Sequence, residues 1–294
     1  MNAFEERFTL SKDGLHLFYR DYPGPPAQNP GRTPVICVPG LTRNSRDFDF
    51  IASHIAATRR VITTDLRGRG RSGYDHDPRN YAVPVETGDV LQILETLGIS
   101  RVVVLGTSRG GVIAMVMATA KPDLIAGAIL NDMGAQLEAK GLERIYAVMR
   151  SPPSFASWEE AASALARANA PLFPNVGDAN WLAFAHALYR EEGGRIAGDY
   201  DPKFPEAILA GAGTNPRTEN GAADLWRWFA ALTAVPTLVL RGENSELLTG
   251  ETVAAMAHAK PDLVSVTVAN RGHVPFLDEP EAVVAIDGFL ETIA

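Results

Sequence analysis

The pentapeptide GTSRG at residues 106–110 places a serine, Ser108, where it could act as a nucleophile. The apolar run 101–105 before it is rich in valine and predicts a strand buried on both faces of a parallel sheet. The apolar stretch 112–120 after it predicts a buried helix. Glycines two positions before and after the serine let neighbouring backbone approach closely, so that the turn can expose the Ser108 hydroxyl. The pattern therefore predicts nucleophilic catalysis at Ser108.

A histidine that could serve as the base lies near the other end of the chain, at His273. Gly272 and Pro275 flank it and favour a loop, because neither residue suits a helix interior or a central strand. The preceding apolar run, 264–268, predicts a strand. In an open parallel sheet, ligands bind beyond the carboxyl ends of the strands. We therefore expect His273 and Ser108 at the same edge, and their order along the chain matches that of a serine–acid–histidine triad.

The elements that must position these side chains alternate along the chain. Segments 6–10 and 16–20 alternate polar and apolar residues on either side of an Asp-Gly pair, which predicts an antiparallel N-terminal hairpin. From residue 34 onward, apolar runs alternate with helical stretches, which predicts an α/β fold with a mostly parallel central sheet and helices on both faces. The predicted sheet strands after the hairpin are residues 34–38, 60–65, 101–105, 125–130, 236–241 and 264–268. The predicted helices are residues 47–57, 85–97, 112–120, 249–259 and 280–293.

The alternation stops between Asn131 and Ala234, where about a hundred residues contain amphipathic stretches but no convincing strand. Ser157 and Glu160 form a capping box there and predict the start of a helix. We therefore predict a helical cap inserted after the sixth strand. The predicted division is residues 1–133 for the first part of the α/β core, 134–218 for the helical cap and 219–294 for the second part of the core.

The composition excludes several classes of partner. A formal charge of −8 argues against a nucleic-acid partner or an anionic membrane surface, because either calls for a basic field. The N-terminus carries acidic residues where a signal peptide is basic, and no apolar run reaches membrane-spanning length. The single cysteine, Cys37, lies in an apolar run and predicts a buried thiol. These features favour a cytoplasmic protein that acts on a small molecule, and they do not distinguish a monomer from a homodimer.

Four motifs together resemble those of the α/β-hydrolase superfamily, and the resemblance covers essentially the whole predicted core. VPGL at 38–41 resembles the oxyanion loop, although Pro-Gly stands where His-Gly is common. DLRGRGRS at 65–72 resembles the turn after the fourth strand of that superfamily. The pentapeptide at 106–110 resembles its nucleophile elbow, and residues 272–275 resemble its histidine loop. The predicted insertion falls where the superfamily places its helical cap.

The resemblance implies acyl transfer to Ser108, with His273 taking the hydroxyl proton and returning it to the leaving group. The developing oxyanion would bind the backbone N–H groups of Leu41 and Arg109. Pro39 cannot donate a hydrogen bond, which is why Leu41 is the expected donor of its loop. Water would then release the acyl group, so neither a metal nor an organic cofactor is expected.

The acid of the triad is the least regular of these motifs. Related enzymes often carry an aspartate three residues after the glycine of the seventh core strand, where this chain has Ser245. We expect the adjacent Glu246 to act as the acid, because its additional methylene can compensate for an offset of one residue. Asp132, which follows the predicted strand 125–130, is the alternative acid, at a site that relatives use.

The resemblance leaves several reactions open. We prefer hydrolysis of a small carboxylic ester or lactone, and the alternative among hydrolases is cleavage of carbon–carbon bonds in ring-fission products. A lyase or a ligand-binding pseudoenzyme on the same fold is the alternative from another class. Arg109 could anchor a substrate carboxylate, and Trp158 and His186 of the insertion are further candidate contacts. The glycines at 68, 70 and 73 have dinucleotide-binding spacing, but a polar loop follows them instead of a helix, so no nucleotide cofactor is expected.

Overall fold

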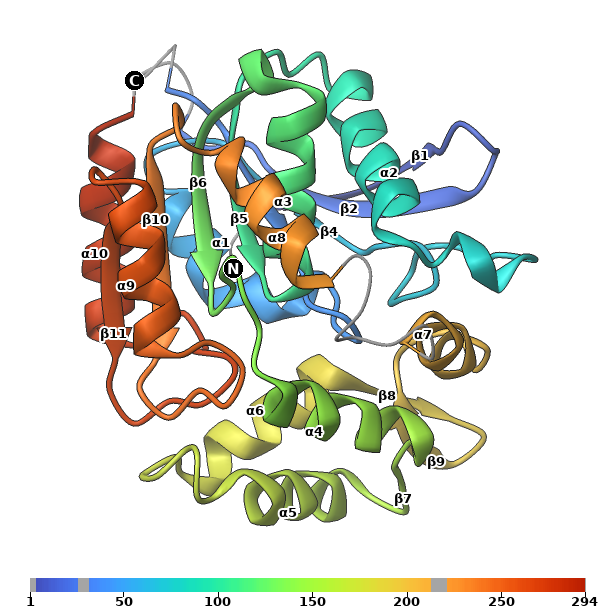
Figure 1. Ribbon diagram of the computed structural model, residues 1–294. Coiled ribbons are helices and arrows are strands. Elements are labelled where there is room, and N and C mark those ends of the chain that lie inside the picture. Colours follow the sequence, from blue (N-terminus) through green and yellow to red (C-terminus); the bar gives the residue numbers. More distant parts are fainter. Residues whose placement is uncertain (1–3, 26–31, 213–220, 294) are drawn as a thin grey trace.

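An eight-stranded sheet forms the centre of the computed structural model, which describes residues 4–25, 32–212 and 221–293 (Figure 1). Its strand order is β1-β2-β4-β3-β5-β6-β10-β11. Neighbouring strands from β4 to β11 are parallel, and the β1–β2 hairpin joins β4 in antiparallel orientation, as predicted. The strands, each of which coincides with a predicted run, are β1 (Glu5–Leu10), β2 (His16–Tyr22), β3 (Val35–Val38), β4 (Val61–Thr64), β5 (Val102–Thr107), β6 (Ile125–Asn131), β10 (Thr237–Gly242) and β11 (Val264–Val268).

Helices cover both faces of the sheet, because successive residues of a buried strand point to opposite sides. Within β5, Val103 belongs to the apolar cluster on one side of the sheet, and Val104 belongs to the cluster on the other side. The first cluster includes side chains of α1 (Asp49–Ile55) and α10 (Pro280–Glu291). The second includes side chains of α2 (Val83–Thr96), α3 (Arg109–Ala120), α8 (Gly221–Ala230) and α9 (Gly250–Ala259).

A separate group of elements lies beyond the carboxyl ends of β5 and β6, below the sheet in Figure 1. Its helices are α4 (Ala139–Arg150), α5 (Trp158–Asn169), α6 (Asp178–Leu188) and α7 (Phe204–Ala212). The predicted start of α5 is confirmed, because Ser157 Oγ accepts a hydrogen bond from the backbone N–H of Glu160. The predicted division at residue 133 stays a prediction, and the predicted boundary between residues 218 and 219 lies outside the described residues.

The expectation that this part of the chain contains no strands is wrong. It holds a three-stranded sheet in the order β7-β9-β8, made of β7 (Ser154–Phe155), β8 (Tyr189–Glu192) and β9 (Arg195–Gly198). Gly193 and Gly194, both at positive φ, form the two-residue turn between β8 and β9. The sequence of β8, YREE, is too polar for a search based on apolar runs to detect.

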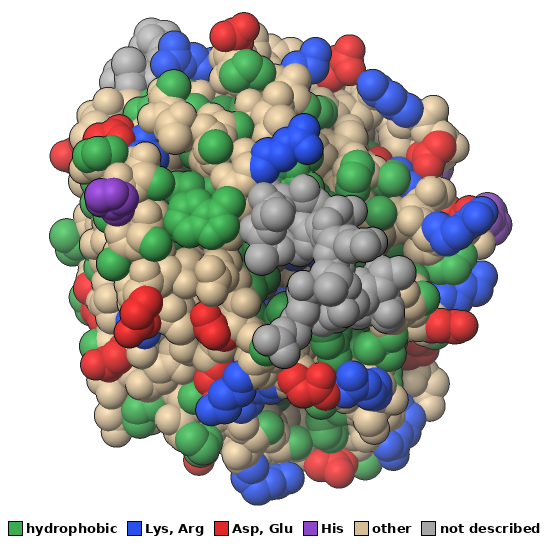
Figure 2. All heavy atoms as spheres, in the orientation of Figure 1, with side chains coloured by type: hydrophobic (Ala, Val, Ile, Leu, Met, Phe, Trp, Pro, Cys, Tyr) green, Lys and Arg blue, Asp and Glu red, His purple; other side chains and the backbone are tan. Residues whose placement is uncertain are grey.

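On the face of the molecule shown in Figure 2, acidic and basic side chains are interspersed. Among the residues that the structure describes, no helix is both long enough and apolar enough to cross a membrane. Cys37 is fully buried, and burial raises the pKa of its thiol well above the usual range.

Candidate active site

Ser108 occupies a strained turn between the end of β5 and the start of α3. Its φ of 50° and ψ of −113° lie outside the regions that non-glycine residues ordinarily adopt, at a cost of about 1–3 kcal/mol. The two flanking glycines make this turn possible. A Cβ atom on Gly106 would lie 2.3 Å from the carbonyl oxygen of Gly110, and one on Gly110 would lie 2.0 Å from that of Val38. The predicted close approach of backbone around Ser108 is therefore present.

A chain of hydrogen bonds links the serine to a histidine and a carboxylate. His273 Nε2 lies 2.9 Å from Ser108 Oγ, and His273 Nδ1 lies 2.7 Å from Asp132 Oδ2. Because a carboxylate can only accept, Nδ1–H donates to Asp132, and Nε2 is left to accept the serine proton. Asp132 is fully buried, and its Oδ1 accepts a further hydrogen bond of 2.8 Å from the backbone N–H of Gly242. The arrangement can activate Ser108 as a nucleophile.

The expectation that Glu246 contacts His273 is wrong. The Glu246 carboxylate pairs instead with Lys140 at 2.6 Å and with Arg144 at 3.5 Å, both on α4. Asp132, the alternative acid, takes the place beside His273, because it directly follows β6 and β6 lies between β5 and β10 in the sheet.

The loop after β3 carries the predicted oxyanion donor Leu41 and lies against the serine. A Cβ atom on Gly40 would lie 3.8 Å from Ser108 Cβ, so the backbone of this loop lies close to the nucleophile. The carbonyl oxygen of Gly40 accepts a hydrogen bond from the backbone N–H of Arg43. Because the C=O and N–H of a trans peptide point in opposite directions, the N–H of Leu41 points away from that hydrogen bond. Arg109 begins α3, and backbone N–H groups in the first turn of a helix have no acceptor within the helix. The assignment of Leu41 and Arg109 as donors stays a prediction.

The residues on either side of Ser108 line different cavities. Arg109 lines a cavity of about 720 Å³, between the start of α2 and the helices α4 and α7. Tyr146, Lys203 and Glu206 also line it, together with apolar residues of α7. Thr107 lines a second cavity of about 460 Å³, which reaches α6. The two cavities therefore reach the sequence neighbours of Ser108, one on each side of the serine.

Comparison with known proteins identifies the family. Residues 35–286 match the model of the alpha/beta hydrolase family. The chain belongs to that family. This alpha/beta hydrolase is 34% identical over 290 residues to a 3-hydroxybutyrate-oligomer hydrolase of Cupriavidus necator, with 94% of each chain covered.

Two further proteins are similar to this alpha/beta hydrolase. It is 25% identical over 254 residues to a 2-(acetamidomethylene)succinate hydrolase of Mesorhizobium japonicum, with 86% of each chain covered. The crystal structure of an alpha/beta hydrolase from Novosphingobium aromaticivorans superimposes with a TM-score of 0.91 at 40% identity, with 100% of each chain covered. The predicted fold class is thereby confirmed.

Each of the three residues predicted to contact the substrate of this alpha/beta hydrolase contacts other groups of the protein in the structure. The Arg109 guanidinium donates from Nε to Glu86 Oε2 at 2.6 Å and from Nη2 to the carbonyl oxygen of Tyr81 at 3.1 Å. The rings of Trp158 and His186 contact each other with their centroids 4.0 Å apart and their planes tilted by 30°, and His186 lines the smaller cavity. Their roles toward a substrate stay predictions.

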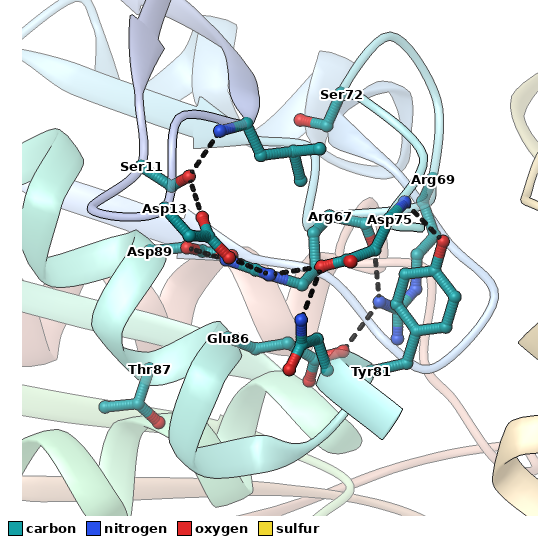
Figure 3. Close-up of polar contacts among 12 residues, drawn as sticks. Ser11, Asp13, Arg67, Arg69, Ser72, Asp75, Tyr81, Glu86, Thr87 and Asp89 are labelled. Atoms are coloured by element: carbon teal, nitrogen blue, oxygen red, sulfur yellow. Dashed lines mark hydrogen bonds and ion pairs between the residues drawn. The ribbon is translucent and has the colours of Figure 1, made fainter. Parts of the chain in front are cut away.

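A buried charge network, which the sequence does not predict, lies next to the site. Arg69 and Glu86 are both fully buried and form an ion pair of 2.6 Å, drawn in Figure 3. Burial, opposed by the charge of Glu86, lowers the pKa of Arg69 to about 10. Burial acts to raise the pKa of Glu86, but the charges of Arg109 and Arg69 outweigh it and lower that pKa. Arg69 lies in the DLRGRGRS motif, whereas no local signal distinguishes Glu86 from a solvent-exposed helix residue.

Proposed function

We propose that this protein is a serine hydrolase that cleaves a carboxylic ester through an acyl-Ser108 intermediate. The observation that carries the proposal is the continuous hydrogen-bonded chain from Ser108 through His273 to the buried Asp132. His273 Nε2 removes the hydroxyl proton while Ser108 Oγ attacks the ester carbonyl, and His273 then gives that proton to the departing alcohol. A water molecule, deprotonated in turn by His273, attacks the acyl-enzyme and releases the acid.

Asp132 keeps His273 in the productive tautomer and stabilises the imidazolium that forms when the serine proton is transferred. The backbone N–H groups of Leu41 and Arg109 bind the oxygen that becomes negative in the tetrahedral intermediate. The position of Gly40 against Ser108 and the start of α3 at Arg109 support this assignment.

The proposed substrate class is a short ester of hydroxy acids. The support is the relative named 3-hydroxybutyrate-oligomer hydrolase, because 94% of both chains align with it. Such an oligomer joins its units through ester bonds and ends in a carboxylate. The larger cavity can hold a short chain of that kind, since it combines apolar residues of α7 with polar side chains, among them the cationic Lys203 and the acidic Glu206.

Labelling with a fluorophosphonate probe tests the proposal directly. We expect the probe to modify Ser108 in the wild-type protein, and we expect Ser108→Ala and His273→Gln to abolish labelling. The same variants should lose hydrolysis of an aryl butyrate and of a 3-hydroxybutyrate trimer. Wild-type protein that neither reacts with the probe nor cleaves either ester would favour the lyase or the ligand-binding alternative. Cleavage of the aryl ester without cleavage of the trimer would reject the substrate class and keep the chemistry.

A further inference from the structure

One carboxylate is bound by two arginines directly beside the candidate oxyanion donors. Glu86 lies in the first turn of α2 and is fully buried. Its Oε1 accepts from Arg69 Nη1 at 2.6 Å, and its Oε2 accepts from Arg109 Nε at 2.6 Å. Both carboxylate oxygens are therefore engaged, each by a different arginine.

Each arginine also reaches one of the two predicted donor segments. Arg69 Nε donates a hydrogen bond of 2.9 Å to the carbonyl oxygen of Leu41, in the loop after β3. Arg109 carries the other predicted donor on its own backbone, and its guanidinium is held between Glu86 and the carbonyl oxygen of Tyr81. Glu86 thus links, through two side chains, the segments that follow β3 and β5. These two segments must keep a fixed distance if their N–H groups are to bind one oxyanion.

The charge balance of this cluster differs from that of an ordinary buried ion pair. Two guanidinium groups face one carboxylate, so the three residues carry one excess positive charge. Arg69 Nη2 is buried and has no hydrogen-bond partner among the residues that the structure describes, while its guanidinium carbon lies 3.9 Å from the ring centre of Phe204. A buried excess positive charge destabilises the folded protein. The same charge stabilises negative charge that develops nearby during a reaction.

We propose that Glu86 is a positioning residue that orients both oxyanion donors, through Arg69 toward Leu41 and through Arg109 toward the start of α3. The proposal rests on acyl transfer at Ser108 as the function. It assigns Glu86 no contact with the substrate. Its effect is to keep the two donor peptides in place in the transition state, so it contributes to the rate of acylation and little to ground-state binding.

Asp89, on the same helix as Glu86, offers a matched control, and Figure 3 labels both residues. Asp89 is also buried, and it binds Arg67 through two hydrogen bonds of 2.6 and 2.7 Å. The remaining ion-pair partners of Arg67 among the described residues are Asp13 and Asp75. Breaking the Asp89–Arg67 pair therefore removes a buried ion pair of the same kind and leaves the side-chain partners of Glu86 in place. Arg69 Nη1 also donates to the backbone carbonyl oxygen of Arg67 at 2.6 Å, a contact that Asp89→Asn does not remove.

The experiment compares Glu86→Gln with Asp89→Asn in the full-length protein. For both variants we expect a lower melting temperature. For Glu86→Gln alone we expect the rate of fluorophosphonate labelling at Ser108 and the kcat for an aryl butyrate to fall at least about tenfold, with KM within about twofold of wild type. The affinity for butylboronic acid, which forms a tetrahedral anion on the serine, should fall by a similar factor.

Equal labelling rates and boronate affinities in the two variants would overturn the inference. If Glu86→Gln does not fold, Arg69→Lys decides by the same measurements, because one ammonium group cannot span both Glu86 and Leu41 as a guanidinium does. Arg69→Lys with wild-type kcat and boronate affinity would equally overturn it. Wild-type protein that is not labelled at Ser108 would instead reject the proposed function itself, so the two failures are distinguishable.

Discussion

The hydroxyl of Ser245 donates a hydrogen bond of 2.5 Å to Asp132 Oδ2, the same oxygen that accepts from His273 Nδ1. Asp132 follows β6 and Ser245 lies shortly after β10, and these two strands are neighbours in the sheet. Ser245 stands at the position where related enzymes often carry the acid. Here that position supplies a donor, and the adjacent strand supplies the carboxylate.

Asp132→Asn should lower kcat for an aryl ester by about 10³- to 10⁴-fold, because an amide at this place favours the wrong tautomer of His273. Steady-state kinetics on folded protein measure the effect. Glu246→Gln is the control and should keep kcat within about threefold of wild type, since its carboxylate binds Lys140 and Arg144 on α4. A large loss of kcat in Glu246→Gln with little loss in Asp132→Asn would reverse the assignment of the acid.

Ser245→Ala should reduce both stability and activity. The variant loses the donor to Asp132 and the acceptor for the backbone N–H groups of Leu247 and Leu248. We expect a loss of about 1–3 kcal/mol in the free energy of unfolding, measured with urea, because buried polar groups are left without partners. The kcat should fall by about three- to tenfold, a factor that corresponds to about one hydrogen bond. Ser245→Thr retains the hydroxyl, and a loss of kcat as large as that of Ser245→Ala would show that the hydroxyl is not what matters.

Gly106→Ala should prevent stable folding or cost several kcal/mol, because the added Cβ would lie 2.3 Å from the backbone oxygen of Gly110. Thermal unfolding monitored by circular dichroism measures the loss. Gly88→Ala in α2 is the matched control, since a Cβ atom there meets nothing within 4 Å. That variant should gain about 0.5–1 kcal/mol from its higher helix propensity. Similar melting temperatures for the two variants would contradict the packing of the serine turn.

Acid should destabilise the protein in part through Asp13. The hydrogen bond from Arg67 lowers the pKa of Asp13 from 3.8 to about 2. The folded state therefore binds this proton less readily than the unfolded chain does, and the stabilisation, present above pH 3.8, is lost as the pH falls through about 2. Asp13→Asn should be less stable than wild type at pH 7, with a difference that shrinks below pH 4.

Asp77→Asn provides the contrast for this measurement. The hydrogen bond from Arg79 also lowers the pKa of Asp77 to about 2, but these two residues are only two positions apart and remain close in the unfolded chain. Its substitution should change the slope of stability against pH much less than Asp13→Asn does. Chemical unfolding at several pH values between 2 and 7 measures both slopes. Equal slopes for both variants would contradict the long-range Asp13–Arg67 pair as the source.

Features that depend on neighbours along the chain can be predicted from the order of residues alone. The valine-rich run of β5, the glycines around Ser108 and the loop signals at His273 each express a local steric or hydrophobic preference. Because the carboxyl ends of parallel strands share one edge, these local patterns were enough to predict that serine and histidine meet there.

The carboxylate that contacts His273 and the residues around the loop after β3 depend on how the chain packs in three dimensions. Asp132 and His273 are 141 positions apart, and their contact depends on the order of strands across the sheet. Glu86 on α2 and Arg69 in the turn after β4 are 17 positions apart, and no local pattern in the sequence pairs them. A charged side chain becomes part of a site when packing removes it from water and fixes its partner, and local sequence patterns do not encode that long-range geometry.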